Sequence, residues 1–237
     1  MANLKEKLKN FQDTIKYYFN NQNLLKQALM HSSYANEKHM NKLANNERLE
    51  FLGDAVLELV SSEYIYGKNK LMHEGELTKL RASMVCEPTL AMCAKEINLG
   101  DYLLLGKGED ATGGRYRNSI LSDALEATIG AIYLDGGFTN AKEFINHFIL
   151  DDMDNKKLFY DSKTILQEII QGMSKEVLCY QLVGEEGPDH NKKFTIEAML
   201  GDEKLSVGVG RTKKSAEQQA AYKAILELQA NQRDRSL

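Results

Sequence analysis

Four carboxylates recur at helical spacing within residues 46–58. Successive members lie three or four residues apart, which places them on one face of a helix; they are Glu47, Glu50, Asp54 and Glu58. Like charges at this spacing repel one another, and Arg48 is the only basic residue between Asn46 and Lys68. A hard divalent cation such as Mg²⁺ would neutralise this face, because it prefers oxygen ligands. The spacing therefore indicates a metal site, although for Glu58 a solvated surface is the better interpretation.

A second acidic pair stands in residues 119–134, a segment that is apolar on almost every side and therefore predicts a buried helix. Its only charges are Asp123 and Glu126, and no Lys or Arg occurs between Arg117 and Lys142. Burying ionised carboxylates without a partner costs several kcal/mol. A metal shared with the first acidic face explains this pair better than a solvated surface does.

Helices must position both acidic sets. The first acidic helix is expected from about Asn46 to Tyr66, with its apolar side formed by Leu49, Leu52, Val56 and Leu59. Gly136 and Gly137 are expected to end the second acidic helix, and residues 141–149 to form a last one. Residues 35–45 and 106–115 are predicted to be loops. No Glu-x-x-His occurs, which argues against a di-iron bundle.

The acidic blocks at residues 46–54 and 122–127 resemble the paired signature of the ribonuclease III family. The resemblance implies an all-α endonuclease domain over residues 1–152, with Mg²⁺ as cofactor and Mn²⁺ able to substitute. The expected metal ligands are Glu50, Asp54, Asp123 and Glu126. Glu126 is the first candidate for a catalytic ligand and Asp54 the second, while Glu47 and Glu74 match accessory acidic positions nearer the RNA. The family also implies a homodimer, for which Phe51 is a candidate contact.

Beyond a polar linker predicted at residues 153–159, the periodicity changes. Residues from Ser162 predict a helix, which is followed by strands at 178–183, 194–199 and 205–209 and by a final helix. This order is typical of a small α+β module, here residues 160–230. It resembles a double-stranded RNA-binding domain in its α-β-β-β-α order and in three surface elements.

These surface elements imply how the module would hold double-stranded RNA. The first helix carries the residues suited to 2′-hydroxyls and base edges in the minor groove, Lys163, Gln167 and Gln171. The 187–190 loop, with His190, resembles a segment that enters the next minor groove. Lys213 and Lys214, at the start of the last helix, suit phosphates. Each element has an ordinary alternative, namely solvated amides, a simple turn and a solvated lysine pair.

Composition limits the partners and the compartment. The chain has 237 residues and a net charge of −4, so RNA affinity must come from local patches. Three cysteines without a Cys-x-x-Cys argue against disulfides and a zinc site. The N-terminus resembles no secretion signal and no apolar run could span a membrane, so we expect a cytoplasmic protein. The glycine-rich segment at 106–114 lacks a dinucleotide fingerprint, and no nucleotide cofactor is expected.

The implied function is Mg²⁺-dependent hydrolysis of phosphodiester bonds in double-stranded RNA, leaving 5′-phosphates and short 3′ overhangs. The expected substrates are ribosomal RNA precursors and structured messenger and transfer RNA transcripts. Two alternatives stay open at this point. One is a non-catalytic regulator that binds double-stranded RNA, and the other is a carboxylate–metal enzyme that acts on small phosphate compounds.

Overall fold

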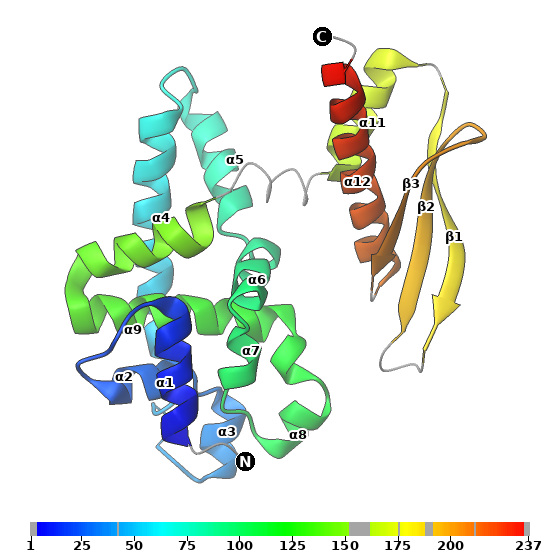
Figure 1. Cartoon of the computed structure of the whole chain (residues 1–237). Coiled ribbons are helices and arrows are strands. Elements are labelled where there is room, and N and C mark those ends of the chain that lie inside the picture. The colour runs from blue at the N-terminus through cyan, green and yellow to red at the C-terminus, as the bar shows by residue number, and fades with distance from the viewer. Residues whose placement is uncertain are drawn as a thin grey trace. The chain divides into compact units, whose positions relative to one another are not determined.

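The chain forms two compact units in this computed structural model, Met1–Met153 and Asp154–Leu237 (Figure 1). The structure describes residues 4–41, 43–151, 162–174, 176–187, 192–210 and 212–234. The linker predicted at 153–159 lies outside these residues, and the predicted domain boundaries stay a prediction. Among the described residues, no helix has both the length and the apolar character needed to cross a bilayer.

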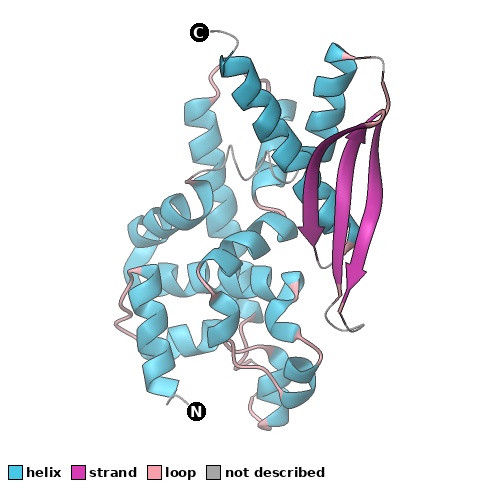
Figure 2. Cartoon of the chain, turned by 45° about the vertical axis from the view of Figure 1, so that its right-hand side comes forward, coloured by secondary structure: helices cyan, strands magenta, loops and turns pink. Residues whose placement is uncertain are grey.

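The first unit consists of helices joined by short loops (Figure 2). In chain order they are α1 (Leu4–Ile15), α2 (Gln22–Ala28), α3 (Ser32–Glu37), α4 (Glu47–Lys68), α5 (Glu74–Met84), α6 (Glu87–Glu96), α7 (Leu99–Tyr102), α8 (Lys107–Ala111), η1 (Gly114–Tyr116), α9 (Asn118–Ile145) and η2 (Asn146–Leu150). The core gathers around α9, whose residues from Ile120 to Ile132 are almost all buried. The prediction of a buried second acidic helix is confirmed.

The two acidic helices, α4 and α9, cross in direct backbone contact. A Cβ atom added at Gly53 of α4 would lie 1.8 Å from the carbonyl oxygen of Glu126 in α9. A Cβ atom added at Gly130 of α9 would lie 2.2 Å from the carbonyl oxygen of Leu49 in α4. Only glycine permits so close an approach at these two positions. The crossing therefore places the start of α4 directly against the acidic segment of α9.

Several local predictions were wrong. The predicted loop at 35–45 contains the end of α3, which begins at Ser32 and whose first turn is capped by the His31 side chain accepting from the Ser33 backbone N–H. The predicted loop at 106–115 contains α8 and the start of η1, held by ion pairs that apolar periodicity does not register. Leu59, expected on the apolar side of α4, is 58% exposed.

Gly137 marks the end of the second acidic helix as predicted. Its φ of 79° and ψ of −178° interrupt the helical backbone within α9, and the chain then continues as a helix to Ile145. A φ in this range favours glycine.

The second unit is an antiparallel sheet that is preceded by one helix in the sequence and followed by another. Its elements are α11 (Ser162–Met173), β1 (Leu178–Glu186), β2 (Lys193–Leu200), β3 (Glu203–Gly210) and α12 (Lys213–Asp234). The strands lie in the order β1-β2-β3, and the α-β-β-β-α prediction is confirmed. Leu166 and Ile170 of α11 pack with Ala221, Ala224 and Ile225 of α12 to form the core.

Candidate active site

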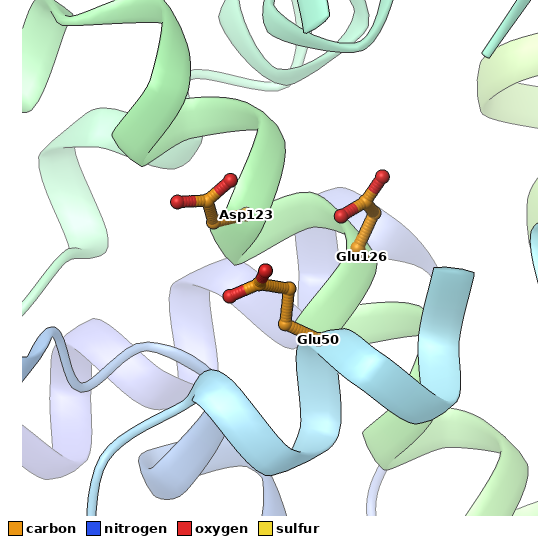
Figure 3. A group of neighbouring side chains, drawn as sticks. All are labelled: Glu50, Asp123 and Glu126. Atoms are coloured by element: carbon orange, nitrogen blue, oxygen red, sulfur yellow. The ribbon is translucent and has the colours of Figure 1, made fainter. Parts of the chain in front are cut away.

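Three carboxylates from the two crossing helices converge. Glu50 comes from α4, and Asp123 and Glu126 come from α9 (Figure 3). Each offers an oxygen, and these oxygens all lie within 4.8 Å of one another. Opposite ligands of an octahedral Mg²⁺ lie about 4.2 Å apart, because each bond is about 2.1 Å long. The 4.8 Å limit is slightly larger than this, so small movements of the side chains would bring the all-oxygen donor set around one hard divalent cation.

The backbone around the cluster is fixed by local hydrogen bonds. The Asn46 N–H donates to the Met30 carbonyl at 2.9 Å, and the Glu50 N–H donates to the Asn46 carbonyl at 2.9 Å, so the first turn of α4 is anchored to the segment after α2. On α9, Ser122 Oγ donates to the Ser119 carbonyl and lies 3.4 Å from Asp123 Oδ1. The carboxylates therefore project from rigid elements.

Partial burial raises the pKa values of all three carboxyls, and repulsion from the other acidic residues adds to the shifts of Glu50 and Glu126. Burial raises the pKa of Glu126 to about 8, and the charges of Asp54, Glu50 and Asp123 add to the shift. Burial is also the largest cause of the raised pKa values of Glu50 and Asp123. Such shifts are typical of functional sites. A divalent cation would reverse them by neutralising the charges.

The other predicted acidic residues lie around this group at different positions. Asp54 is exposed on α4 and is not among the three converging residues, yet its charge is the largest charge effect on the pKa of Glu126. Glu47 and Glu58 are also exposed on α4, and the charge of Glu58 acts on Asp54. Glu74 lies on α5, where its Oε1 accepts from Thr78 Oγ1 at 3.1 Å.

Two residues near Asp123 were not predicted as site residues. Burial has the largest effect on the pKa of Asp123. The charge of Glu87, the first residue of α6, also raises this pKa, whereas the charge of His31 lowers it. His31 was interpreted as structural, and it does cap α3. No spacing rule connects either residue to Asp123, because α6 and the segment before α3 approach α9 only in the folded chain.

The predicted RNA-contacting residues of the second unit differ in their surroundings. Gln167 and Gln171 are exposed on α11, and Lys213 and Lys214 are exposed at the start of α12. Lys163 was expected on the exposed face of α11, but its side chain is only partly exposed. Its ammonium pairs with Glu217 Oε2 at 2.5 Å. His190 and most of its loop lie outside the described residues.

Comparison with known proteins identifies both units. Residues 21–153 match the model of a ribonuclease-III-like family, and residues 162–228 match the double-stranded RNA binding motif. Ribonuclease 3 of Oceanobacillus iheyensis is 49% identical over 209 residues, which cover 87% of this chain and 92% of that protein. The chain belongs to the ribonuclease III family. It is an endoribonuclease with a nuclease domain followed by a double-stranded RNA-binding domain, and the family prediction is confirmed.

Further relatives agree with this assignment. Ribonuclease 3 of Caldanaerobacter subterraneus is 48% identical over 217 residues, covering 90% of this chain and 95% of that protein. A solved nuclease domain of ribonuclease III from Campylobacter jejuni, with structural flexibility in a region involved in dimer formation, aligns with a TM-score of 0.58 and 45% identity. The alignment covers 62% of this chain and 99% of the Campylobacter jejuni chain.

Proposed function

We propose that this ribonuclease III hydrolyses phosphodiester bonds in double-stranded RNA with Mg²⁺ held by Glu50, Asp54, Asp123 and Glu126. The convergence of Glu50, Asp123 and Glu126 supports the proposal, because these partly buried carboxylates bring oxygens within 4.8 Å of one another and the charges of Glu50 and Asp123 raise the pKa of Glu126. When bound, the metal would activate a water molecule and stabilise the leaving 3′-oxygen. Mn²⁺ should substitute, since it shares the preference for carboxylate ligands.

Each acidic residue has a distinct proposed role. Glu126 is the most buried carboxylate of the cluster and holds the metal directly, while Asp54 approaches from the exposed side of α4. Glu50 and Asp123 complete the ligand set. Glu47 and Glu74, whose charges are not among those that act on Glu126, are proposed to line the path of the RNA instead. Glu58 lies beyond them and has no catalytic role.

The raised pKa of Glu126 predicts how stability depends on pH. In the unfolded chain this carboxyl binds a proton only below about 4.5, whereas the folded, metal-free protein holds it up to about 8. The folded state therefore binds more protons over this interval, and the free energy of unfolding should fall as pH rises from 5 to 8. The same direction holds for Glu50, Asp54 and Asp123.

Thermal melting in a chelator tests this dependence. The melting temperature should decrease as the pH is raised from 5 to 8. The rise in melting temperature caused by Mg²⁺ should become larger over the same interval, because the metal binds the ionised site. Glu126→Gln should flatten both trends. A parental melting temperature that does not decrease between pH 5 and pH 8, or that decreases just as steeply in Glu126→Gln, would contradict the proposed metal site.

The RNA-binding domain is proposed to bind RNA through two kinds of contact, one with the minor groove and one with phosphates. Gln167 and Gln171 would reach the minor groove and His190 the next one, while Lys213 and Lys214 would hold phosphates. Lys163, also predicted as an RNA contact, forms an ion pair within the domain. The domain is not basic overall, with eleven Lys or Arg against twelve Asp or Glu from residue 161 onward. Binding should therefore be modest and sensitive to salt.

Replacing Lys213 and Lys214 together by Ala should weaken duplex binding for unrelated sequences alike. The slope of log affinity against log salt should become shallower by roughly 1–2 units, because each phosphate contact releases condensed counterions. Gln167→Ala should lower affinity while leaving that slope unchanged, since its proposed partners are neutral. The measurement is a salt titration in Ca²⁺ with cleavage blocked by Glu126→Gln. An unchanged slope in the lysine variant would mean that both lysines face solvent.

The enzyme is proposed to act as a homodimer. Phe51 is 81% exposed on α4 beside a groove lined by Leu24, Leu52 and Leu134, which suits an apolar contact between two copies. One active site per subunit would make staggered cuts, leaving 5′-phosphates and short 3′ overhangs. Precursors of ribosomal RNA and structured messenger and transfer RNA transcripts in the cytoplasm are the proposed substrates.

Mapping the termini of cleaved duplex RNA tests the proposed reaction. A long perfect duplex labelled on each strand should yield 5′-phosphate ends accepted by ligase, and the two strands should be cut a fixed few nucleotides apart. Blunt products or 5′-hydroxyl ends would contradict the proposed chemistry. The same RNA as a single strand is the matched control, and it should survive.

A further inference from the structure

The side chain of Lys163 is enclosed by two elements other than its own helix. Its Nζ lies 2.5 Å from Oε2 of Glu217 in α12 and 4.8 Å from the centre of the Tyr180 ring in β1. The side chains of Lys163 and Glu217 are 38% and 26% exposed, so both are partly withdrawn from water. An ion pair of this kind is more strongly coupled than a fully exposed one.

The Tyr180 hydroxyl, next to this ion pair, is withdrawn from solvent. Its oxygen is buried and has no hydrogen-bond partner among the described residues. Burial raises the pKa of Tyr180 to about 12, and the nearby charge of Glu217 adds to the shift. The phenol is therefore neutral, and its ring offers Lys163 an aromatic face.

Three elements meet at this contact. α11 carries Gln167 and Gln171, one and two turns beyond Lys163, while α12 begins with Lys213 and Lys214, one turn before Glu217. Ser162 Oγ also donates to the Gln218 carbonyl at 2.8 Å, directly beside the ion pair. Besides the apolar packing of α11 on α12, an ion pair and a hydrogen bond thus link the proposed minor-groove helix to the first turns of α12, which carry the proposed phosphate lysines.

We propose that Lys163 is a positioning residue rather than an RNA contact, and that Glu217 is its partner in setting α11 against the start of α12. This inference rests on the proposed RNA-binding role of Gln167, Lys213 and Lys214. A duplex presents minor groove and phosphates at fixed separation, so both contacts form only when the two helices are held at the matching distance. Glu217 assists binding although its charge repels phosphate.

The direction in which one substitution changes the affinity for duplex RNA distinguishes this proposal from a simple electrostatic effect. Glu217→Gln removes a negative charge close to the phosphate-binding lysines, which by charge alone should tighten duplex binding. Positioning predicts the opposite result, a loss of roughly fivefold to tenfold, because the ammonium of Lys163 loses the negative charge that holds it. Lys163→Met should weaken binding to a similar extent without changing the salt slope, and the double variant should be no weaker than either single one.

Three controls accompany these variants in the full chain, in Ca²⁺ with Glu126→Gln. Lys163→Arg keeps a cation between the carboxylate and the ring, so affinity should recover. Tyr180→Phe removes only a hydroxyl without a partner, so binding should not change. Lys204→Met breaks another lysine pair of the domain, with Glu197 at 3.3 Å, and should also leave affinity unchanged.

Fluorescence anisotropy with a duplex RNA at several salt concentrations provides the readout, and melting curves identify any variant that is unfolded at the assay temperature. Weaker binding by folded Glu217→Gln with an unchanged slope for Lys163→Met supports the proposal. Tighter binding by Glu217→Gln, or a slope shallower by about one for Lys163→Met, would overturn it, since Lys163 would then contact phosphate. Failure of the parent to bind duplex RNA would instead refute the proposed RNA-binding function.

Discussion

Replacing Glu126 by Gln should lower the cleavage rate by on the order of 10³-fold or more, while duplex RNA still binds in the presence of a divalent ion. The amide keeps the volume of the side chain but removes the most buried charge of the metal cluster. A loss of this size corresponds to about 4 kcal/mol of transition-state stabilisation. Single-turnover cleavage of a labelled duplex at saturating enzyme measures it.

Stability distinguishes this loss of chemistry from loss of structure. Glu126→Gln removes a source of repulsion within the cluster, so in a chelator at pH 8 the variant should melt at a higher temperature than the parent. Glu58→Gln is the matched control on α4, because Glu58 is exposed and lies outside the converging group. A Glu126→Gln variant that cleaves near the parental rate would exclude Glu126 from the metal site.

Replacing Gly53 by Ala should destabilise the nuclease domain by about 3 kcal/mol or more. The new methyl group would stand 1.8 Å from the Glu126 carbonyl oxygen and 2.9 Å from the Gly130 nitrogen, both of them backbone atoms of α9. These atoms cannot rotate away as a side chain could, so the two helices must separate. Because Glu50 and Glu126 come from opposite sides of this crossing, metal affinity should fall together with stability.

Denaturant unfolding and Mn²⁺ titration of the same samples test both effects. Gly67→Ala is the matched control, because Gly67 lies in the same helix and an added Cβ would meet nothing within 4 Å. That control should stabilise the protein by about 0.5–1 kcal/mol through helix propensity. Equal stability of Gly53→Ala and the parent would show that α4 and α9 are not in backbone contact in solution.

The crossing of α4 and α9 also marks the limit of what the sequence could predict. Helical spacing was enough to place Glu50 beside Asp54, and Asp123 beside Glu126, because it describes neighbours within one helix. The convergence of the two pairs depends on how the helices cross, and Gly53 and Gly130 permit that crossing. Neither glycine breaks its helix, and no local pattern indicates that the two face each other.

The same reasoning explains why neither the partner of Lys163 nor the exposure of Leu59 could be predicted. The helical period correctly separated buried Leu166 and Ile170 from exposed Gln167, but it could not identify Glu217, which lies 54 residues beyond Lys163. Leu59 falls on the apolar side of α4 by spacing, yet it lines a surface groove between α4 and α5. Periodicity predicts which side of a helix is apolar. It does not predict how much of that side the neighbouring helices cover, and Leu59 lies on a part that they leave exposed.

Incubation of the full chain with a long labelled duplex RNA, in Mg²⁺ or in a chelator, tests most directly whether the converging carboxylates form a metal-dependent nuclease site. We expect short fragments from the duplex in Mg²⁺, and an intact duplex both in the chelator and with Glu126→Gln. The single-stranded form of the same RNA should survive in every condition. Cleavage that proceeds equally in the chelator, or a duplex that stays intact in Mg²⁺, would contradict the assignment of this site.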